Sequence, residues 1–212
     1  MILGFSTTGP YCGAALFSGD SVIVDTHEEM ARGQGERLMV LIEETLAQAG
    51  VTYTDLQAIG VGIGPGNFTG IRLSVSAARG LALGLDIPAV GVSSLEALTF
   101  GHKGPVLASI PAGRDRLYLQ RFAKGADRGP ELVSLGELQG WSHPELICVG
   151  NRDAEIAAEL GAKTGSSSVH PASAVAQIAA LRWQDNPSPP VPLYIRSADA
   201  APSRDLPPRI LD

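Results

Sequence analysis

The sequence predicts an α/β protein made of two similar halves, each a mixed sheet flanked by helices. In each half, about three short strand-like segments come first and are followed by alternating helices and strands, an order typical of a mixed sheet with helices on its faces. The 212 residues are 44% hydrophobic and 18% charged, which is an ordinary globular composition. Aromatic residues make up only 5% while glycine occurs 25 times, which favours close packing of helices on sheets over a core of large rings.

The first half is organised around a strand, a turn and a helix that follow one another directly. An apolar strand at 58–63 runs into a glycine-rich turn at 64–70, and the helix that follows, 71–85, carries only Arg72 and Arg79 as charges. A helix this apolar has to be covered on both sides. The other elements expected in this half are strands at 2–5, 13–17, 22–27 and 90–92 and helices at 36–49 and from 93 onward.

The second half repeats this layout more loosely, so we expect a division into residues 1–102 and residues 103–212. Two such halves in tandem fit the duplicated ribonuclease-H-like architecture, which actin-like ATPases and sugar kinases share, better than a Rossmann fold. The proline-rich tail from 187 should run extended over the surface, with an edge strand at 193–196. The other elements expected here are strands at 106–110, 117–122, 131–134 and 146–149 and helices at 135–141, 154–160 and 172–183.

Charge, cysteine content and hydropathy exclude several classes of protein. The formal net charge of −6 and the lack of a basic run argue against a primary nucleic-acid surface, because phosphate binding needs clustered lysine and arginine. Cys12 and Cys148 are too few for a disulfide framework and are expected to be inert core thiols. Neither a leader peptide nor a bilayer-spanning run is recognisable, so we expect a cytoplasmic protein without a membrane partner.

The stretch at 62–98, which begins GIGPGNFTGIRLSVSAARG, resembles the TsaB (YeaZ) family of bacteria, and the MILGFSTT start, the Glu36-Arg37-Leu38 helix and the run at 192–196 agree with it. The resemblance implies the actin-like superfold and a likeness to TsaD, the subunit that carries the chemistry of threonylcarbamoyladenosine synthesis next to the tRNA anticodon. It implies a non-catalytic dimerisation or scaffold subunit that pairs with TsaD through first-domain helices, works with TsaE and meets tRNA only indirectly. No cofactor of its own is implied, ATP belongs to the complex, and the chain alone is expected to form a two-fold homodimer.

The sequence lacks the metal-binding histidines and the acidic residue that catalytic relatives of this family carry. TsaD-like proteins hold a metal with a His-x-x-x-His pair, but the corresponding segment here, 32–38, has no histidine, and we expect neither a metal site nor a catalytic residue. Ser6 stands where actin-like kinases carry an acidic residue, and Pro111 departs in a similar way in the second half. Whether Asp115, in the loop 114–116, substitutes for that residue is left open. The alternative to a scaffold is a small actin-like enzyme, either a kinase or a metal-dependent hydrolase.

The glycine-rich turn has two interpretations. A glycine turn that leads into a helix N-terminus can bind an anion, so Gly64, Gly66, Asn67 and Thr69 are candidates for a site close to a nucleotide. However, the turn lacks the Gly-Lys-Ser/Thr of a phosphate-binding loop and the spacing of a dinucleotide fingerprint. The sequence therefore favours a tight strand-to-helix turn, with Asn67 or Thr69 as the helix cap.

Small side chains recur every four residues along the central helix, at Gly70, Ser74, Ala78 and Ala82, and are expected to let a partner helix approach closely. Burial of the whole helix in its own domain is equally compatible with the pattern, and the family resemblance favours the partner. The expected partner interface consists of Leu38, Leu41, Gly70, Arg72, Leu73, Ser74, Ala77, Ala78, Arg79 and Leu81. Arg72 and Arg79 share one face of the helix. Three roles are open for them: they flank the expected interface, they bind acidic residues of the partner, or they are solvated surface charges.

Overall fold

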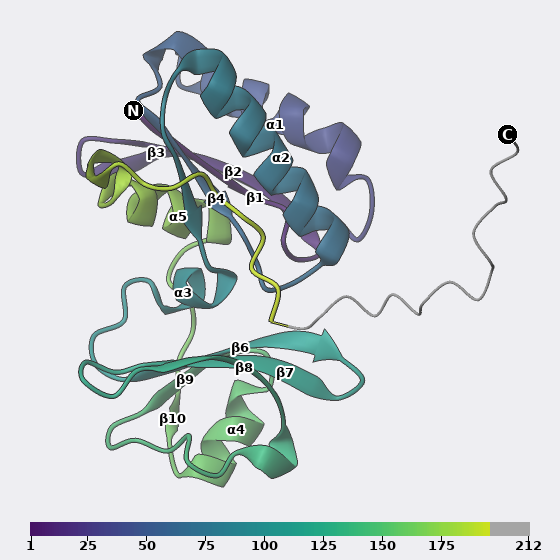
Figure 1. Cartoon of the computed structure of the whole chain (residues 1–212), viewed down its shortest axis with the longest axis vertical. Helices are drawn as coiled ribbons and strands as arrows, with labels where there is room; N and C mark the ends of the chain where they lie inside the picture. Colours follow the sequence, from purple (N-terminus) through teal and green to yellow (C-terminus); the bar gives the residue numbers. More distant parts are fainter. Residues whose placement is uncertain (196–212) are drawn as a thin grey trace, which may run out of the picture.

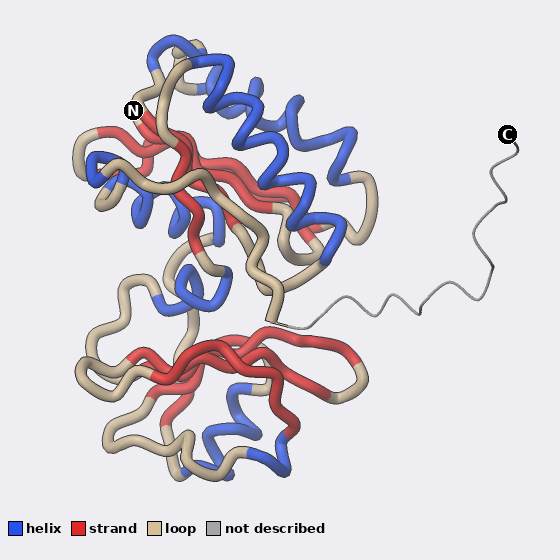
Figure 2. Tube along the Cα trace, in the orientation of Figure 1, coloured by secondary structure: helices blue, strands red, loops and turns tan. Residues whose placement is uncertain are grey.

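The structure is a computed structural model, and it describes residues 1–195. Two halves, each with its own sheet, lie one above the other with a short helix between them (Figure 1). In both halves helices cover the layer of strands, as the colouring of Figure 2 makes clear. Arg196, the last residue of the expected edge strand, and the rest of the predicted tail lie outside the described residues.

The first sheet has the strand order β3-β2-β1-β4-β5. Its elements are β1 (Ile2–Ser6), β2 (Tyr11–Ser18), β3 (Ser21–Glu29), β4 (Ala58–Gly62) and β5 (Ala89–Val92), with α1 (Gln34–Gln48) and α2 (Phe68–Leu85) on one face. β1 pairs antiparallel with β2 and parallel with β4. Because side chains alternate along a strand, Leu3 and Phe5 enter the core cluster under α1 and α2, whereas Ile2 faces the opposite side.

The second sheet repeats this topology. Its strands are β6 (Val106–Gly113), β7 (Arg116–Phe122), β8 (Arg128–Ser134), β9 (Ile147–Gly150) and β10 (Lys163–Thr164), in the order β10-β9-β6-β7-β8. In each half, the first strand pairs antiparallel with the second and parallel with the fourth. The other pairings also correspond, so both halves have the order 3-2-1-4-5 counted from their first strand. The duplicated ribonuclease-H-like fold is therefore confirmed.

Three further helices complete the layers. Helix α3 (Ser94–Thr99) lies between the halves and α4 (Asp153–Leu160) covers the outer face of the second sheet (Figure 1). Helix α5 (Pro171–Ala180) comes late in the sequence but packs on the first sheet, on the face opposite α1 and α2. Gly4 and Gly60 make this possible, because backbone atoms of α5 and its alanines lie where their side chains would stand. The division of the chain at residue 102 stays a prediction. Helix α5, which lies in the expected second part of the chain, packs on the sheet of the first part.

One expected helix, at 135–141, is a single 3-10 turn at Leu135–Glu137. Its start is stabilised by Glu137, whose carboxylate accepts hydrogen bonds from the N–H and the hydroxyl of Ser134, each at 2.9 Å. Gly140, with φ of +79°, then turns the chain away. A capped turn of this kind carries the same residue types as the start of a longer helix, which is why the sequence suggested one.

Two further expectations differ near the end of the described chain. The helix expected at 172–183 ends at Ala180. Residues 191–195 form no strand, although the N–H of Leu193 donates to the carbonyl oxygen of Ile63 at 2.8 Å. Among residues 1–195, no helix combines the length and the apolarity that crossing a membrane requires.

Candidate partner-docking surface

The glycine-rich turn between β4 and α2 packs against the loop that follows β1. Gly64 and Gly66 have φ values of +93° and +155°, in the region that favours glycine. A Cβ at Gly66 would also overlap the carbonyl oxygen of Thr8, which accepts a hydrogen bond from the N–H of Asn67 at 2.7 Å. The turn thus holds the start of α2 against the end of β1.

Asn67 caps helix α2. Its Oδ1 accepts hydrogen bonds from the N–H groups of Thr69 and Gly70, at 3.0 and 3.2 Å. These are the groups that an anion at a helix N-terminus would need. The structure therefore supports the interpretation as a structural turn over the interpretation as an anion site, and it shows that Asn67, rather than Thr69, is the cap.

A cavity of about 210 Å³ lies between the two halves and is lined by residues of both. Four hydroxyl groups form one network there: Thr8 Oγ1 lies 3.0 Å from both Ser6 Oγ and the Tyr11 hydroxyl, and it accepts a hydrogen bond from Ser94 at 2.9 Å. Burial raises the pKa of Tyr11, so this phenol is neutral. Among residues 1–195, those that line the cavity include no acidic or basic side chain.

The residue types at this cavity do not fit a magnesium-bound nucleotide, which needs carboxylates for the metal and cations for the phosphates. Ser6 is 2% exposed and occupied by the hydroxyl network, and Pro111 lines the cavity from the other half. Asp115 does not replace an acidic residue here, because it lies in the exposed β6–β7 turn. Nor do residues 1–195 contain a group of three or more His, Cys, Asp or Glu side chains arranged to hold a metal.

The stripe of small residues expected to meet a partner faces the chain's own sheet. Ser74 is fully buried, and its Oγ accepts a hydrogen bond from the N–H of Thr7 at 3.0 Å and lies 2.7 Å from the Thr7 hydroxyl. Gly70 packs on the Thr7 carbonyl so closely that no side chain fits. Five residues of the expected interface are core residues in this way: Leu38, Leu41, Gly70, Ser74 and Ala78. These five residues join the helices to the sheet and are not accessible at the surface, and their contact with a partner stays an untested prediction.

A different stripe of α2 faces outward. Gly80 and Gly84 have no heavy atom within 4 Å of where a Cβ would stand, and Leu83 is 84% exposed. On α1, Met39 and Val40 are 38% and 45% exposed. We call this surface the outer α1–α2 face; it consists of Met39, Val40, Leu73, Ser76, Ala77, Gly80, Leu83 and Gly84.

The other five residues of the expected interface remain accessible. Leu73, Ala77 and Leu81 are half-buried beside the core between the helices and the sheet. Arg72 and Arg79 are exposed on the flank of α2 away from α1. Their contact with a partner stays a prediction.

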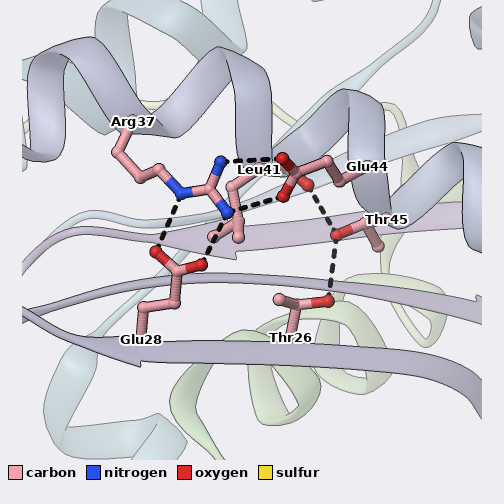
Figure 3. Close-up of polar contacts among 6 residues, drawn as sticks. All are labelled: Thr26, Glu28, Arg37, Leu41, Glu44 and Thr45. Atoms are coloured by element: carbon pink, nitrogen blue, oxygen red, sulfur yellow. Dashed lines mark hydrogen bonds and ion pairs between the residues drawn. The ribbon is translucent and has the colours of Figure 1, made fainter.

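Helix α1 is fastened to the edge strand β3 by one arginine (Figure 3). Arg37 donates from Nε and Nη2 to both carboxylate oxygens of Glu28, at 2.8 and 2.6 Å. It also donates hydrogen bonds to the carboxylate of Glu44, about two turns further along α1. These hydrogen bonds raise the pKa of the guanidinium and lower the pKa of both carboxyls. Beside them, Thr45 donates to Thr26 at 3.3 Å. These contacts hold α1, and with it the α1 side of the outer α1–α2 face, against the sheet.

A family model described as "TsaD: tRNA N6-adenosine threonylcarbamoyltransferase" matches residues 26–196. The tRNA threonylcarbamoyladenosine biosynthesis protein TsaB of Escherichia coli is 34% identical over 139 residues, which are 61% of this chain and 59% of that protein. The chain belongs to the TsaB (YeaZ) family.

One further protein is similar to this chain in sequence, and one solved structure is similar to it in fold. An uncharacterised protein of Mycobacterium tuberculosis is 35% identical over 187 residues, covering 87% of this chain and 82% of that protein. The solved structure of YeaZ from Pseudomonas aeruginosa superposes with a TM-score of 0.74 at 22% identity, over 91% of this chain and 98% of that chain. The second match shows a shared fold.

Proposed function

We propose that this TsaB-family chain takes part in the synthesis of N6-threonylcarbamoyladenosine in tRNA, as a non-catalytic partner that docks on TsaD through the outer α1–α2 face and acts together with TsaE. Family membership and the relative named TsaB support the pathway. The observation that carries the docking proposal is the outward stripe of α2, with two helical glycines facing open space beside a highly exposed leucine.

Glycine inside a helix lowers the stability of the folded chain by about 1 kcal/mol relative to alanine. A glycine at such a position therefore indicates that a side chain would be unfavourable there. The reason for Gly70 lies within the chain, because its neighbour Thr7 leaves no room for a side chain. No such neighbour exists for Gly80 or Gly84 among the described residues. Close approach of a backbone from another protein supplies the missing reason, and the exposed apolar side chains around these glycines favour the same surface.

The proposal gives the chain no chemistry of its own. The uncharged cavity between the halves offers neither ligands for a metal nor cations for phosphates, so any ATP is bound in the assembled complex. The net charge of −6 favours indirect contact with tRNA, through TsaD. In the absence of TsaD, the same apolar face makes the chain a homodimer with two-fold symmetry.

Reconstitution from purified proteins tests the proposal. We expect the full chain to co-purify with TsaD from the same organism, and threonylcarbamoyl transfer to tRNA to require both proteins together with TsaE and ATP. The chain without TsaD should transfer nothing and should bind Mg-ATP no more tightly than a control protein in calorimetry. Transfer by the chain alone would contradict the proposal, and so would tight stoichiometric binding of Mg-ATP or of a metal, which would favour the kinase or hydrolase alternative.

A further inference from the structure

After α5 the chain returns to the N-terminal end of α2, where residues 193–195 contact separate parts of the fold. The N–H of Leu193 donates to the carbonyl oxygen of Ile63, next to the end of β4, at 2.8 Å. Ile195 packs on the apolar cluster shared by α3, β6 and β9. Tyr194 lies between these two anchors, and its side chain reaches the exposed flank of α2.

Tyr194 and Phe68 together orient the side chain of Arg72. The Nε of Arg72 donates to the Tyr194 hydroxyl at 3.0 Å, and its Cζ lies 4.0 Å from the centroid of the Phe68 ring. The two rings stack with their centroids 5.1 Å apart. All three residues are exposed, Phe68 to 42% and Tyr194 to 45%. The guanidinium of Arg72 is therefore held in place before any partner arrives.

The other arginines held by hydrogen bonds find their acceptors within the chain: Arg121 and Arg116 donate to backbone carbonyl oxygens, and four more pair with a carboxylate. Arg37, Arg128, Arg152 and Arg182 each pair with a glutamate. Within residues 1–195, Arg72 pairs with no acidic side chain, although the chain as a whole carries an excess of negative charge. A cation that is oriented but has no counter-charge among residues 1–195, at the edge of an apolar surface, has the properties of an interface hot spot.

We propose that Arg72, positioned by Tyr194 and Phe68, binds a carboxylate of the protein partner that docks on the outer α1–α2 face; the inference rests on the proposed function. A guanidinium forms two parallel hydrogen bonds with a carboxylate, and a side chain that is already ordered loses little entropy on binding. Arg79 lies on the same flank, about 10 Å further along the helix. It has no hydrogen-bond partner within residues 1–195, so its contribution is the smaller one.

A carboxylate suits this site better than a phosphate of RNA. Phosphate backbones are bound by clusters of lysine and arginine, whereas Arg72 and Arg79 are two separate cations on a flank that also carries Asp86, on a chain with a net negative charge.

The affinity of the full chain for TsaD, measured by calorimetry on single and double variants, tests the inference. We expect Arg72→Ala to weaken binding about 10- to 100-fold, and Arg72→Lys not to restore it, because lysine cannot form the bidentate pair. Tyr194→Phe keeps the ring but removes the hydroxyl that orients Arg72, and should weaken binding about threefold. In the background of Arg72→Ala this second change should have no further effect. Arg79→Ala, the matched control on the same flank, should weaken binding by less than about threefold.

Thermal unfolding checks that the variants are folded. Because the substituted positions are exposed, their melting temperatures should equal that of the wild type. If Arg72→Ala binds TsaD as tightly as the wild type while a change at Leu83 abolishes binding, the inference is wrong and the proposed function stands. If neither change affects binding, both are wrong. Loss of tRNA binding by Arg72→Ala with unchanged TsaD affinity would assign the site to phosphate and overturn the inference. Equal effects of Arg72→Ala and Arg79→Ala would contradict the role of Tyr194.

Discussion

Replacing Gly80 with alanine is expected to stabilise the free chain and to weaken its complex with TsaD. Gly80 lies inside α2, where glycine costs about 0.5–1 kcal/mol relative to alanine, and nothing lies within 4 Å of where the new methyl group would stand. The free energy of unfolding should rise by this amount. For a chain of this length the melting temperature should rise by about 1–4 °C.

The same methyl group should have the opposite effect in the complex. If a partner backbone packs against Gly80, an added carbon forces the two surfaces apart, and overpacking of this kind costs about 1–3 kcal/mol. The dissociation constant for TsaD should then increase by about 5- to 150-fold. Gly70→Ala, in the same helix, is the contrasting variant: its methyl group would overlap the Thr7 carbonyl, so it should lower the stability of the free chain by more than about 2 kcal/mol.

Thermal unfolding of the free variants and calorimetric titration with TsaD check both parts. A lower melting temperature for Gly80→Ala would show that this side of α2 is not open. A higher melting temperature with unchanged affinity would refute the reasoning that the glycine is there for a partner. Stability of Gly70→Ala equal to that of the wild type would contradict the assignment of Gly70 to the core.

Two further predictions concern titratable groups. Arg37 holds the pKa values of Glu28 and Glu44 below 4.5, so between those lowered values and 4.5 the unfolded chain binds more protons than the folded one, and the free energy of unfolding should fall as the pH drops through this range. Arg37→Ala should remove this part of the pH dependence in urea unfolding between about pH 3 and 6, and identical profiles would contradict the clamp. Burial raises the thiol pKa of Cys12 and Cys148 to about 11, so at about pH 8 both should react with a thiol reagent only after unfolding; rapid reaction in the absence of denaturant would show that a thiol is accessible.

Much of the first half could be predicted from the sequence because its signals are local. The strand at 58–63 and the turn after it lie next to each other, and Asn67 is a preferred cap residue at the position where the helix begins. The repeat of three strands followed by alternating elements was enough to indicate the duplicated fold. These features depend on neighbouring residues and on the order of elements, which the sequence displays directly.

The orientation of α2 could not be predicted, because the helix carries two stripes of small residues with the same spacing. One stripe contains Ser74 and Ala78, the other Ser76 and Gly80. The hydrogen bonds between Thr7 and Ser74 decide which one faces the sheet, and these residues are 67 positions apart in the chain. Nothing in the helical period distinguishes the two stripes, so the sequence could not show which of them is buried against the sheet.

Two long-range features were missed altogether. Helix α5 packs across the first sheet, and Gly4 and Gly60 were its only signals, since glycine inside a strand often marks close approach of a backbone. The clamp between Arg37 and Glu28 joins a helix to an edge strand, and no spacing rule relates residues on two different elements. Both features became visible only when the elements were placed in space.

The most direct test of the account is the affinity for TsaD of two leucine variants. Leu83 on the outer α1–α2 face and Leu181 just after α5 are 84% and 78% exposed, so glutamate at either position should leave the free chain folded. The account predicts that Leu83→Glu abolishes measurable binding to TsaD, because the interface would have to bury the new charge, and that Leu181→Glu binds like the wild type. Binding by Leu83→Glu at wild-type affinity, or loss of binding by Leu181→Glu alone, would contradict the assignment of the partner surface to α1 and α2.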